Sequence, residues 1–300
     1  MSAAAGPAIE LRGVTVRQGG RTLLEAVDLT LETGRTCAVV GSNGSGKSAL
    51  LRVVATLCRP SAGSVRVGGF DALARPDQVR RLIGYVPDEA GLAERLTPRE
   101  HLGMVAAQHG LGRADRRAAT ESMLELVDLV AHDGRYVATL SRGQRRRLAL
   151  AMALVHDPPI ILLDEPVAGV DDVGRGELLS VLVELRSMEK TLLIASQSQA
   201  DVADVCDVVA PLSAGHLLPL TKQEAAVLTW LEVLGDPDPA VRALRERPGV
   251  EDVRQDGSFV TFQGPSSAEE RSQVAEWLVA HAVHLSGFGT TTLPAGGDHP

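Results

Sequence analysis

The segment Gly41-Ser42-Asn43-Gly44-Ser45-Gly46-Lys47-Ser48 constrains the fold more than any other stretch of this 300-residue chain. It matches the pattern G-x-x-x-x-G-K-[ST] of a phosphate-binding loop. An apolar run at 37–40, typical of a buried strand, precedes it, and residues 49–54 after it have the pattern of a helix. Because the motif requires this order of strand, loop and helix, a glycine-rich loop with a chance lysine is the weaker interpretation.

The residue types of this loop indicate its chemistry. Glycines allow backbone N–H groups to turn toward phosphate oxygens, and the following helix adds the positive end of its dipole. Lys47 can reach the β- and γ-phosphates of a nucleotide, and Ser48 can place its hydroxyl on Mg²⁺. The loop therefore predicts a site for a nucleotide with Mg²⁺.

Composition narrows the class of protein. The net charge is −8, and the only lysines are Lys47, Lys190 and Lys222. An acidic chain without a basic stripe argues against general nucleic-acid binding. No apolar run approaches the length of a membrane-spanning helix, and the start lacks a signal-peptide pattern, so a membrane role would need spanning helices from another chain. We interpret Cys37, Cys58 and Cys206 as reduced thiols of a cytoplasmic protein.

The chain alternates between strand and helix patterns. Residues 9–16 and 22–31 alternate like the strands of an antiparallel edge sheet, with a turn at Gly19-Gly20. Further strands are expected at 64–67, 83–86, 160–163, 191–195 and 208–212, and helices within 96–130, at 141–155 and at 173–188. The sequence Thr97-Pro98-Arg99-Glu100 predicts a capped helix start. These elements predict an α/β fold with a mostly parallel, doubly wound sheet and an antiparallel edge subdomain.

Composition shifts near residue 220, and residues 221–300 are predicted to form a small α+β extension. Residues 235–239 have a linker composition, Asp256-Gly257 suits a hairpin turn between strands 248–253 and 258–262, and 283–288 fits a closing strand. Ser267 and Glu270 indicate a helix start, with Val274 and Trp277 on one face. The tail 290–300 is expected to be disordered.

A second phosphate-site element follows the buried strand 160–163. Asp164, at the end of that strand, could hold Mg²⁺ beside the loop, directly or through water. Glu165 points differently and suits a base or orienter for an attacking water. By itself, a strand ending in a charged turn would be the ordinary interpretation, but the phosphate loop makes the catalytic one stronger.

A third element is Leu140 followed by Ser141, Arg142, Gly143 and Gln144, which opens a helix with small and polar groups. It predicts a second helix N-terminus that faces an anion. One chain needs only one phosphate cradle, so this tip is expected to face the nucleotide of another subunit. The three adjacent arginines, 145–147, could form a basic patch, but we interpret them as a solvated helix face or as salt-bridge partners of a second subunit.

These three elements, in this order, resemble the ATP-binding cassette (ABC) ATPases over residues 8–220. The resemblance implies a P-loop NTPase core with a helical subdomain at about 88–156, and ATP and Mg²⁺ as cofactors. It also implies two cassettes that close head to tail on two ATP molecules, so that each Ser141 tip completes the partner's site. It places Asp171, in the loop after Glu165, across the dimer interface.

Several positions depart from the family pattern. Asp88 stands where a glutamine that senses Mg²⁺ is expected, and Gln197 replaces a histidine that meets the γ-phosphate. Gln18 replaces the aromatic ring that stacks on adenine, and Ala49 lacks a second hydroxyl near the α-phosphate although its N–H remains available. Arg142 replaces a small residue, so it either clashes or adds charge near the partner's phosphates. Gln197 can donate a hydrogen bond but cannot carry a positive charge.

The resemblance implies the ATPase subunit of an exporter, bound peripherally to the inner face of the membrane through a separate polytopic membrane subunit. The extension 221–300 weakly resembles regulatory or dimerising extensions of drug, lipid or polysaccharide exporters. The departures predict slow hydrolysis in this chain's own site and a more active second cassette. Two alternatives stay open: a regulatory or scaffold subunit that barely hydrolyses ATP, and a cassette ATPase acting on ribosomes or DNA, which the acidic charge disfavours.

Overall fold

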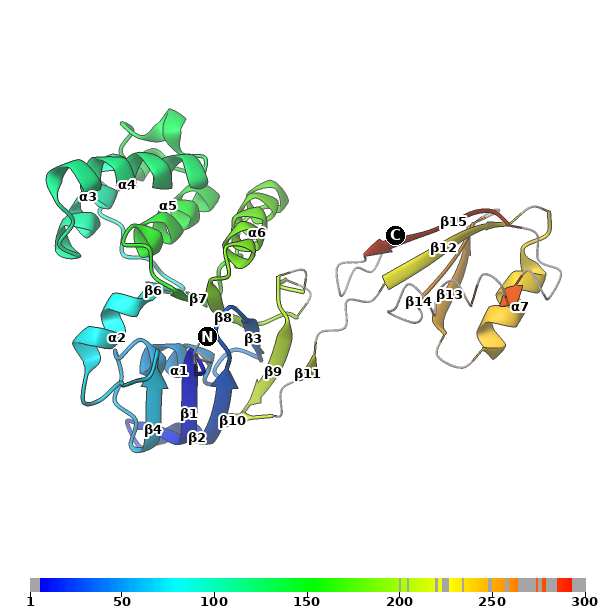
Figure 1. Ribbon diagram of the computed structural model, residues 1–300, viewed down its shortest axis with the longest axis horizontal. Coiled ribbons are helices and arrows are strands. Elements are labelled where there is room, and N and C mark those ends of the chain that lie inside the picture. The colour runs from blue at the N-terminus through cyan, green and yellow to red at the C-terminus, as the bar shows by residue number, and fades with distance from the viewer. Residues whose placement is uncertain are drawn as a thin grey trace, which may run out of the picture. The chain divides into compact units, whose positions relative to one another are not determined.

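The computed structural model describes residues 6–199, 201–203, 205–218, 221–222, 227–233, 235–247, 250–256, 259–263, 274, 277–278 and 285–292. The chain divides into two compact units, Met1–Lys222 and Gln223–Pro300. Both units combine β-sheet with α-helix (Figure 1).

A seven-stranded, mostly parallel sheet forms the frame of the first unit. Its strands lie in the order β10-β9-β3-β8-β7-β6, with β11 paired to β9. Strands β6, β7, β8, β3 and β9 are parallel, whereas β10 and β11 pair antiparallel with β9. All residues of β7 and β8 are buried, which explains the apolar runs 160–163 and 192–195 within them. The strand bounds are β3 Thr36–Val40, β6 Ile83–Val86, β7 Ile160–Asp164, β8 Thr191–Ser196, β9 Val208–Ser213, β10 His216–Leu217 and β11 Thr221–Lys222.

A second, antiparallel sheet lies beside the first, in the order β2-β1-β4-β5. It contains β1 Ile9–Gln18, β2 Arg21–Leu31, β4 Ala62–Val67 and β5 Phe70–Asp71. Its alternating burial agrees with the predicted half-buried strands, and Gly19-Gly20 form the turn with left-handed φ angles of 57° and 77°. Together the two sheets confirm the predicted α/β class with an antiparallel edge subdomain.

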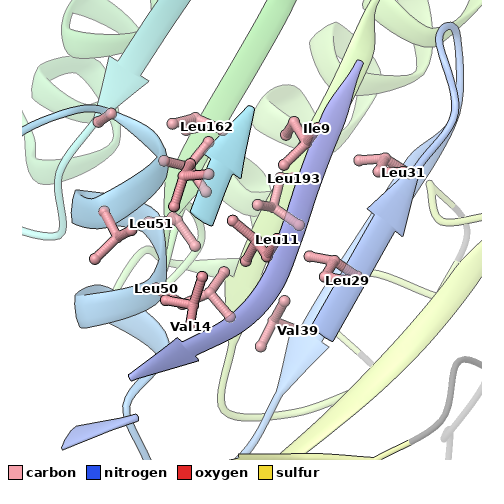
Figure 2. Packing of buried hydrophobic residues seen from close by; sticks show 14 of the residues in the cluster. Ile9, Leu11, Val14, Leu29, Leu31, Val39, Leu50, Leu51, Leu162 and Leu193 are labelled. Atoms are coloured by element: carbon pink, nitrogen blue, oxygen red, sulfur yellow. The ribbon is translucent and has the colours of Figure 1, made fainter. Parts of the chain in front are cut away.

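Helix α1 (Lys47–Val54) packs between the two sheets. Figure 2 shows its Leu50 and Leu51 among Leu11 and Val14 of β1 on one side and Leu162 and others of the parallel sheet on the other. All of these leucine and valine side chains are at most 1% exposed. Burial on both sides therefore fixes the helix that follows the phosphate loop, and with it the position of the loop.

Helices α3, α4 and α5 pack on one another as a helical subdomain with its own apolar cluster (Figure 1). Thr97 caps α3 and exchanges hydrogen bonds with Glu100, as the sequence predicts. The helices of the first unit are α2 Pro76–Leu82, α3 Pro98–Gln108, α4 Arg113–Leu126, α5 Arg142–Leu154 and α6 Asp172–Ser187, with short 3₁₀ turns η1 Val130–His132 and η2 Val137–Thr139.

The second unit contains an antiparallel sheet in the order β13-β14-β12-β15. A cluster that includes Val260, Phe262 and Leu278, none of them exposed, packs it against α7. The bounds are β12 Val227–Val233, α7 Asp238–Glu246, β13 Glu251–Asp256, β14 Phe259–Gln263 and β15 Leu285–Thr292. The hairpin pairing of β13 with β14 is as predicted, and the turn residues 257–258 lie outside the described part.

Two expectations for this unit were wrong. The segment interpreted as a linker, 235–239, instead starts α7, with Pro237 as N-cap and a proline in the first turn. The tail predicted as disordered from 290 continues as strand until Thr292, because Thr290, Thr291 and Thr292 pair with β12. Residues 293–300 and most of the helix predicted after Ser267 lie outside the described residues.

All three cysteines are free. In the described part of the chain, no helix combines the length and the apolar composition that crossing a bilayer requires.

Candidate functional site

The phosphate loop joins β3 to α1 and depends on its glycines. Gly46 has a φ angle of 113°, and a Cβ added to it would lie 2.4 Å from the carbonyl oxygen of Leu23. A Cβ on Gly41 would lie 2.2 Å from the carbonyl oxygen of Leu212. Because backbone closes on the loop from both sides, only glycine fits at these positions, and the loop backbone remains open for an anion.

Lys47 is held inside this loop. Its Nζ lies 2.6 Å from the carbonyl oxygen of Gly41, 3.0 Å from that of Ser42 and 3.2 Å from Oε1 of Glu165. The side chain is only 5% exposed. The lysine thus donates to the backbone of its own loop and pairs with a carboxylate, and a phosphate group would have to compete for the same three hydrogens.

Asp164 ends β7 directly beside α1. It is 1% exposed, and neither carboxylate oxygen has a hydrogen-bond partner. Burial raises the pKa of this carboxyl, while the hydroxyl of Ser48 acts in the opposite direction. Two buried carboxylate oxygens with a serine hydroxyl nearby suit a hard divalent cation such as Mg²⁺. Asp164 and Ser48 therefore fit the predicted metal site, and the geometry brings them together.

Glu165 follows in a strained backbone conformation with a φ angle of 50°. Its Oε2 accepts a hydrogen bond of 3.1 Å from the backbone N–H of Gln197, and its Oε1 faces Lys47. Burial raises the pKa of Glu165, and Lys47 opposes that rise. A left-handed φ at a non-glycine residue is stored strain of the kind that accumulates at functional sites.

Gln197 directly follows β8, the strand between β3 and β7. Lys47, Asp164, Glu165 and Gln197 thus come from three neighbouring parallel strands and meet at their carboxyl ends. This is where a doubly wound sheet places its ligands. All four residues are predicted from the sequence, and the structure brings them together.

Asp88 follows β6 and is engaged differently from its predicted role. Its carboxylate pairs with Arg146 at 2.8 Å, and Arg146 also donates to the carbonyl oxygen of Pro87. Asp88 still contributes to raising the pKa of Asp164, so it lies within electrostatic reach of the metal site. Its role as a metal ligand stays a prediction.

The arginine run 145–147 was misinterpreted. Arg146 and Arg147 are buried and bind partners within the chain, Arg147 pairing with Glu177 at 3.2 Å. They belong to neither a solvated face nor a basic patch. The helical spacing of the sequence could have indicated this burial. Gly143, Arg147 and Leu150 recur at the interval of one helix face, and all three are buried.

Ser141 caps α5 through a capping box with Gln144. The Ser141 hydroxyl accepts from the Gln144 N–H at 3.2 Å, and the Gln144 side chain accepts from the Ser141 N–H at 2.9 Å. Gly143 is buried, whereas Ser141 and Arg142 are exposed. In the described part of the chain, no hydrogen bond or ion pair joins residues 141–144 to the phosphate loop.

The remaining predicted positions lie around the cradle. Ala49 is 9% exposed and packs in the core cluster of α1. Gln18 is exposed at the end of β1, opposite Arg21 of β2. The other predicted phosphate-loop residues are Asn43 and Gly44, both exposed, and Ser45, whose buried hydroxyl has no partner. A buried hydroxyl without a partner is a further group available to a phosphate.

Comparison with known proteins finds relatives that are ATP-binding proteins. A family described as ABC transporter matches residues 24–168. NatA, an ABC transporter ATP-binding protein of Bacillus subtilis, is 35% identical over 193 residues, 64% of this chain and 78% of NatA. The daunorubicin resistance ATP-binding protein DrrA3 of Streptomyces coeruleorubidus is 35% identical over 70% of this chain and 67% of its own. The sulfate/thiosulfate import ATP-binding protein CysA of Mycolicibacterium paratuberculosis is 36% identical over 70% of this chain and 58% of CysA.

Solved structures agree with the fold. The dimeric structure of MJ0796, a bacterial ABC transporter cassette, superposes with a TM-score of 0.66 at 26% sequence identity. The match covers 72% of this chain and 98% of that cassette.

Proposed function

This chain belongs to the ATP-binding proteins of ABC transporters, and from that premise we propose that it closes head to tail with a second cassette on ATP. One observation carries the proposal. Among the described α-helices, only α1 and α5 have no acidic residue in the first turn, whereas the other five each carry one. Acidic residues stabilise helix N-termini, so their absence favours a bound anion at both.

Helix α1 begins at the phosphate cradle, whereas the exposed Ser141 tip has no bond to that cradle. The anion that suits this tip is therefore the phosphate of a nucleotide held by another cassette. The dimeric MJ0796 cassette provides a precedent in a related chain. We propose that a second cassette is the main partner of this surface.

The site residues divide the reaction among them. Lys47 would stabilise charge on the γ-phosphate, and Glu165 would orient a water molecule for in-line attack and accept its proton. Ser48 and Asp164 would hold Mg²⁺, which neutralises charge on the β- and γ-phosphates when bound. Attack forms the new P–O bond as the bond between the β–γ bridging oxygen and the γ-phosphorus breaks, and ADP and phosphate leave.

We propose that ATP hydrolysis is slow in the site built on this chain's phosphate loop, because of Gln197. Its backbone N–H already binds Glu165, and its side chain cannot supply positive charge to the γ-phosphate. Loss of one donor of this kind typically lowers the rate by about 10²–10³-fold. This observation supports the second candidate, a nucleotide-binding subunit with little hydrolysis that pairs with a more active cassette.

Cassettes of this family work with membrane subunits, and we propose export as the direction of transport. The similarity to a daunorubicin resistance protein supports export, as does the presence of the second unit, 223–300. CysA, an import protein, is similar over the cassette but this chain spans only 58% of its length. Co-purification should bring down a polytopic membrane protein. Recovery of ribosomal RNA instead would favour a soluble cassette ATPase.

The central test uses Glu165→Gln in the full chain. With ATP and Mg²⁺, this variant should stay dimeric in size-exclusion chromatography with light scattering, because ATP binds but is not hydrolysed. Lys47→Ala should stay monomeric, and Glu184→Gln, an exposed change on α6, should behave like the wild type. If ATP dissociates from Glu165→Gln as fast as from the wild type, Glu165 is not the water-orienting group.

A further inference from the structure

Arg142 contacts the loop that follows Glu165. A Cβ added to Gly169 would lie 2.6 Å from Nη1, 2.7 Å from Cζ and 3.1 Å from Nη2 of Arg142. The guanidinium therefore occupies the space where a side chain on residue 169 would begin. Gly169 also has a φ angle of 65°, which favours glycine. Arg142 and Gly169 fit each other in both shape and backbone conformation.

The same loop is packed between two helix starts. Val170 lies between Gly143 of α5 and Gly174 of α6: a Cβ on either glycine would be 3.3 Å or less from Cγ1 of Val170. Asp171 caps α6 by accepting from the N–H of Gly174 at 2.9 Å. Glycines at this crossing let the two helix tips approach closely. The loop 165–171 therefore contacts the α5 tip through Gly169 and Val170, and it begins at Glu165.

Arg142 differs from the other arginines of its helix. Arg145 donates to the carbonyl oxygens of Leu140 and Ala138, and Arg146 and Arg147 pair with carboxylates. No carboxylate among the described residues lies within ion-pair distance of Arg142. A cation in the first turn of a helix is electrostatically unfavourable. Arg142 therefore does not serve the stability of α5, whereas its contact with Gly169 links α5 to the loop after Glu165.

We propose that Arg142 is a positioning residue for ATP hydrolysis: it fixes the loop 165–171 to the Ser141 tip. Docking of that tip on a nucleotide in a second cassette is thereby transmitted to Glu165 in this chain. The inference rests on the proposed function, since it needs two cassettes that share their sites. It assigns Arg142 to coupling between the two sites rather than to either phosphate cradle.

The physical reason is the shortness of the connection. Ala168 N–H donates to Glu165 O and Val170 N–H donates to Val167 O, so the loop is a compact pair of turns. A shift of the α5 tip that moves Gly169 therefore moves the backbone that sets the strained φ of Glu165. Small displacements of a catalytic group can lower the rate by about 10²-fold.

The test compares Arg142→Ala with Arg113→Ala in the full chain. Arg113 is the matched control, because it is also an exposed arginine at the first position of a helix, α4. Steady-state ATPase assays should show kcat about tenfold lower for Arg142→Ala, with KM and equilibrium binding of ATP changed less than about twofold. Arg142→Lys should recover only part of kcat, since an ammonium lacks the planar group.

A double-mutant cycle with Gly169→Ala separates coupling from simple damage. In the wild-type background the new Cβ displaces the guanidinium, whereas after Arg142→Ala only the φ strain remains. The two effects on kcat should therefore combine to less than their product. The inference would be overturned if the double variant lowered kcat by the full product of the two single effects, or if Arg142→Ala had the kcat of the wild type.

A failure of this inference can be told from a failure of the proposed function. If the wild type hydrolyses ATP and Glu165→Gln dimerises while Arg142→Ala changes neither, only the role of Arg142 is wrong. Where turnover is too slow to measure, the ATP concentration for half-maximal dimerisation of Glu165→Gln serves instead, and adding Arg142→Ala should raise it about tenfold. If no variant binds ATP or dimerises, both proposals are wrong.

Discussion

Acidification should destabilise the first unit through two stacked histidines. His109 follows α3 and His156 follows α5, with ring centroids 3.6 Å apart and planes 10° from parallel. Nε2 of His156 lies 3.2 Å from the carbonyl oxygen of Ile83, which can only accept, so Nε2 carries the hydrogen of the neutral ring. Its Nδ1 is buried without a partner. A proton on Nδ1 would find no acceptor and would place charge beside His109.

The size of the effect follows from the pKa of His156, which burial and then His109 lower from 6.5 to about 4. Asp157 raises the pKa of His156 and Lys190 lowers it. Burial also lowers the pKa of His109. Below pH 6.5 the unfolded chain gains a proton here that the folded chain refuses until about pH 4. The stabilising contribution is thus fully present above pH 6.5 and is lost as the pH falls toward 4.

Across that interval the free energy of unfolding would fall by about 3 kcal/mol for a fully buried ring. Because His156 is half-buried and solvent screens its charge, about 1.5 kcal/mol is expected, with ~1 kcal/mol already lost at about pH 5. For a unit of this size that corresponds to about 3 °C in Tm.

The assay is chemical or thermal unfolding at about pH 7 and about pH 5 for the wild type, His156→Gln and His216→Gln. Glutamine keeps an N–H for Ile83 but does not titrate. The wild type should lose ~1 kcal/mol more than His156→Gln on acidification. His216→Gln, an exposed position beside Glu25, should follow the wild type. Parallel losses for the wild type and His156→Gln would refute the reasoning.

Three further changes test the site and the second unit. Gln197→His should raise ATPase turnover about tenfold or more with ATP binding intact, since it restores a donor that can carry charge; unchanged turnover in a kinetic assay would contradict the slow-site proposal. Gly46→Ala should weaken ATP binding at least about tenfold, because its Cβ meets Leu23 O and its φ of 113° is strained; equilibrium dialysis measures this, and wild-type affinity would disprove it. Phe262→Ala, at a fully buried position, should destabilise the second unit by about 3–5 kcal/mol in denaturant titrations while ATP binding by the first unit persists; an equal loss of ATP binding would contradict independent units.

Local signals were sufficient for most of the first unit. The capping box at Thr97 and the buried strand before Asp164 appear where their patterns place them, because each is decided by neighbours in sequence. The segment 235–239 shows the limit of such signals. Proline, aspartate and glycine serve both turns and helix starts, and only the buried Ala240, Val241 and Leu244 that follow separate the two. β10 and β11 are two-residue strands whose existence depends on pairing with β9, so no local pattern reveals them.

The site shows the same division between local and long-range information. Lys47, Asp164 and Glu165 could be identified from motifs because their chemistry is carried by adjacent residues. The pair between Asp88 and Arg146 joins residues 58 positions apart, and neither motif contains information on the other. Arg142 was recognised only as a departure, since its contact with Gly169 depends on how α5 crosses the loop before α6.

The ion pair between Lys47 and Glu165 links the residue expected to bind phosphate with the residue proposed to orient the attacking water. Lys47 is shared by two loop carbonyls and the Glu165 carboxylate, and both charged side chains are at least nine-tenths buried. A phosphate that binds Lys47 competes with these three oxygens, and the contact with Glu165 is the longest of them at 3.2 Å. If that contact is lost, Glu165 keeps the bond from the Gln197 N–H. We therefore expect nucleotide binding to weaken the ion pair between Lys47 and Glu165, the proposed water-orienting group. Because Arg142 contacts Gly169 in the loop that begins at Glu165, the proposed second cassette would act on the same carboxylate that the chain's own nucleotide affects through Lys47.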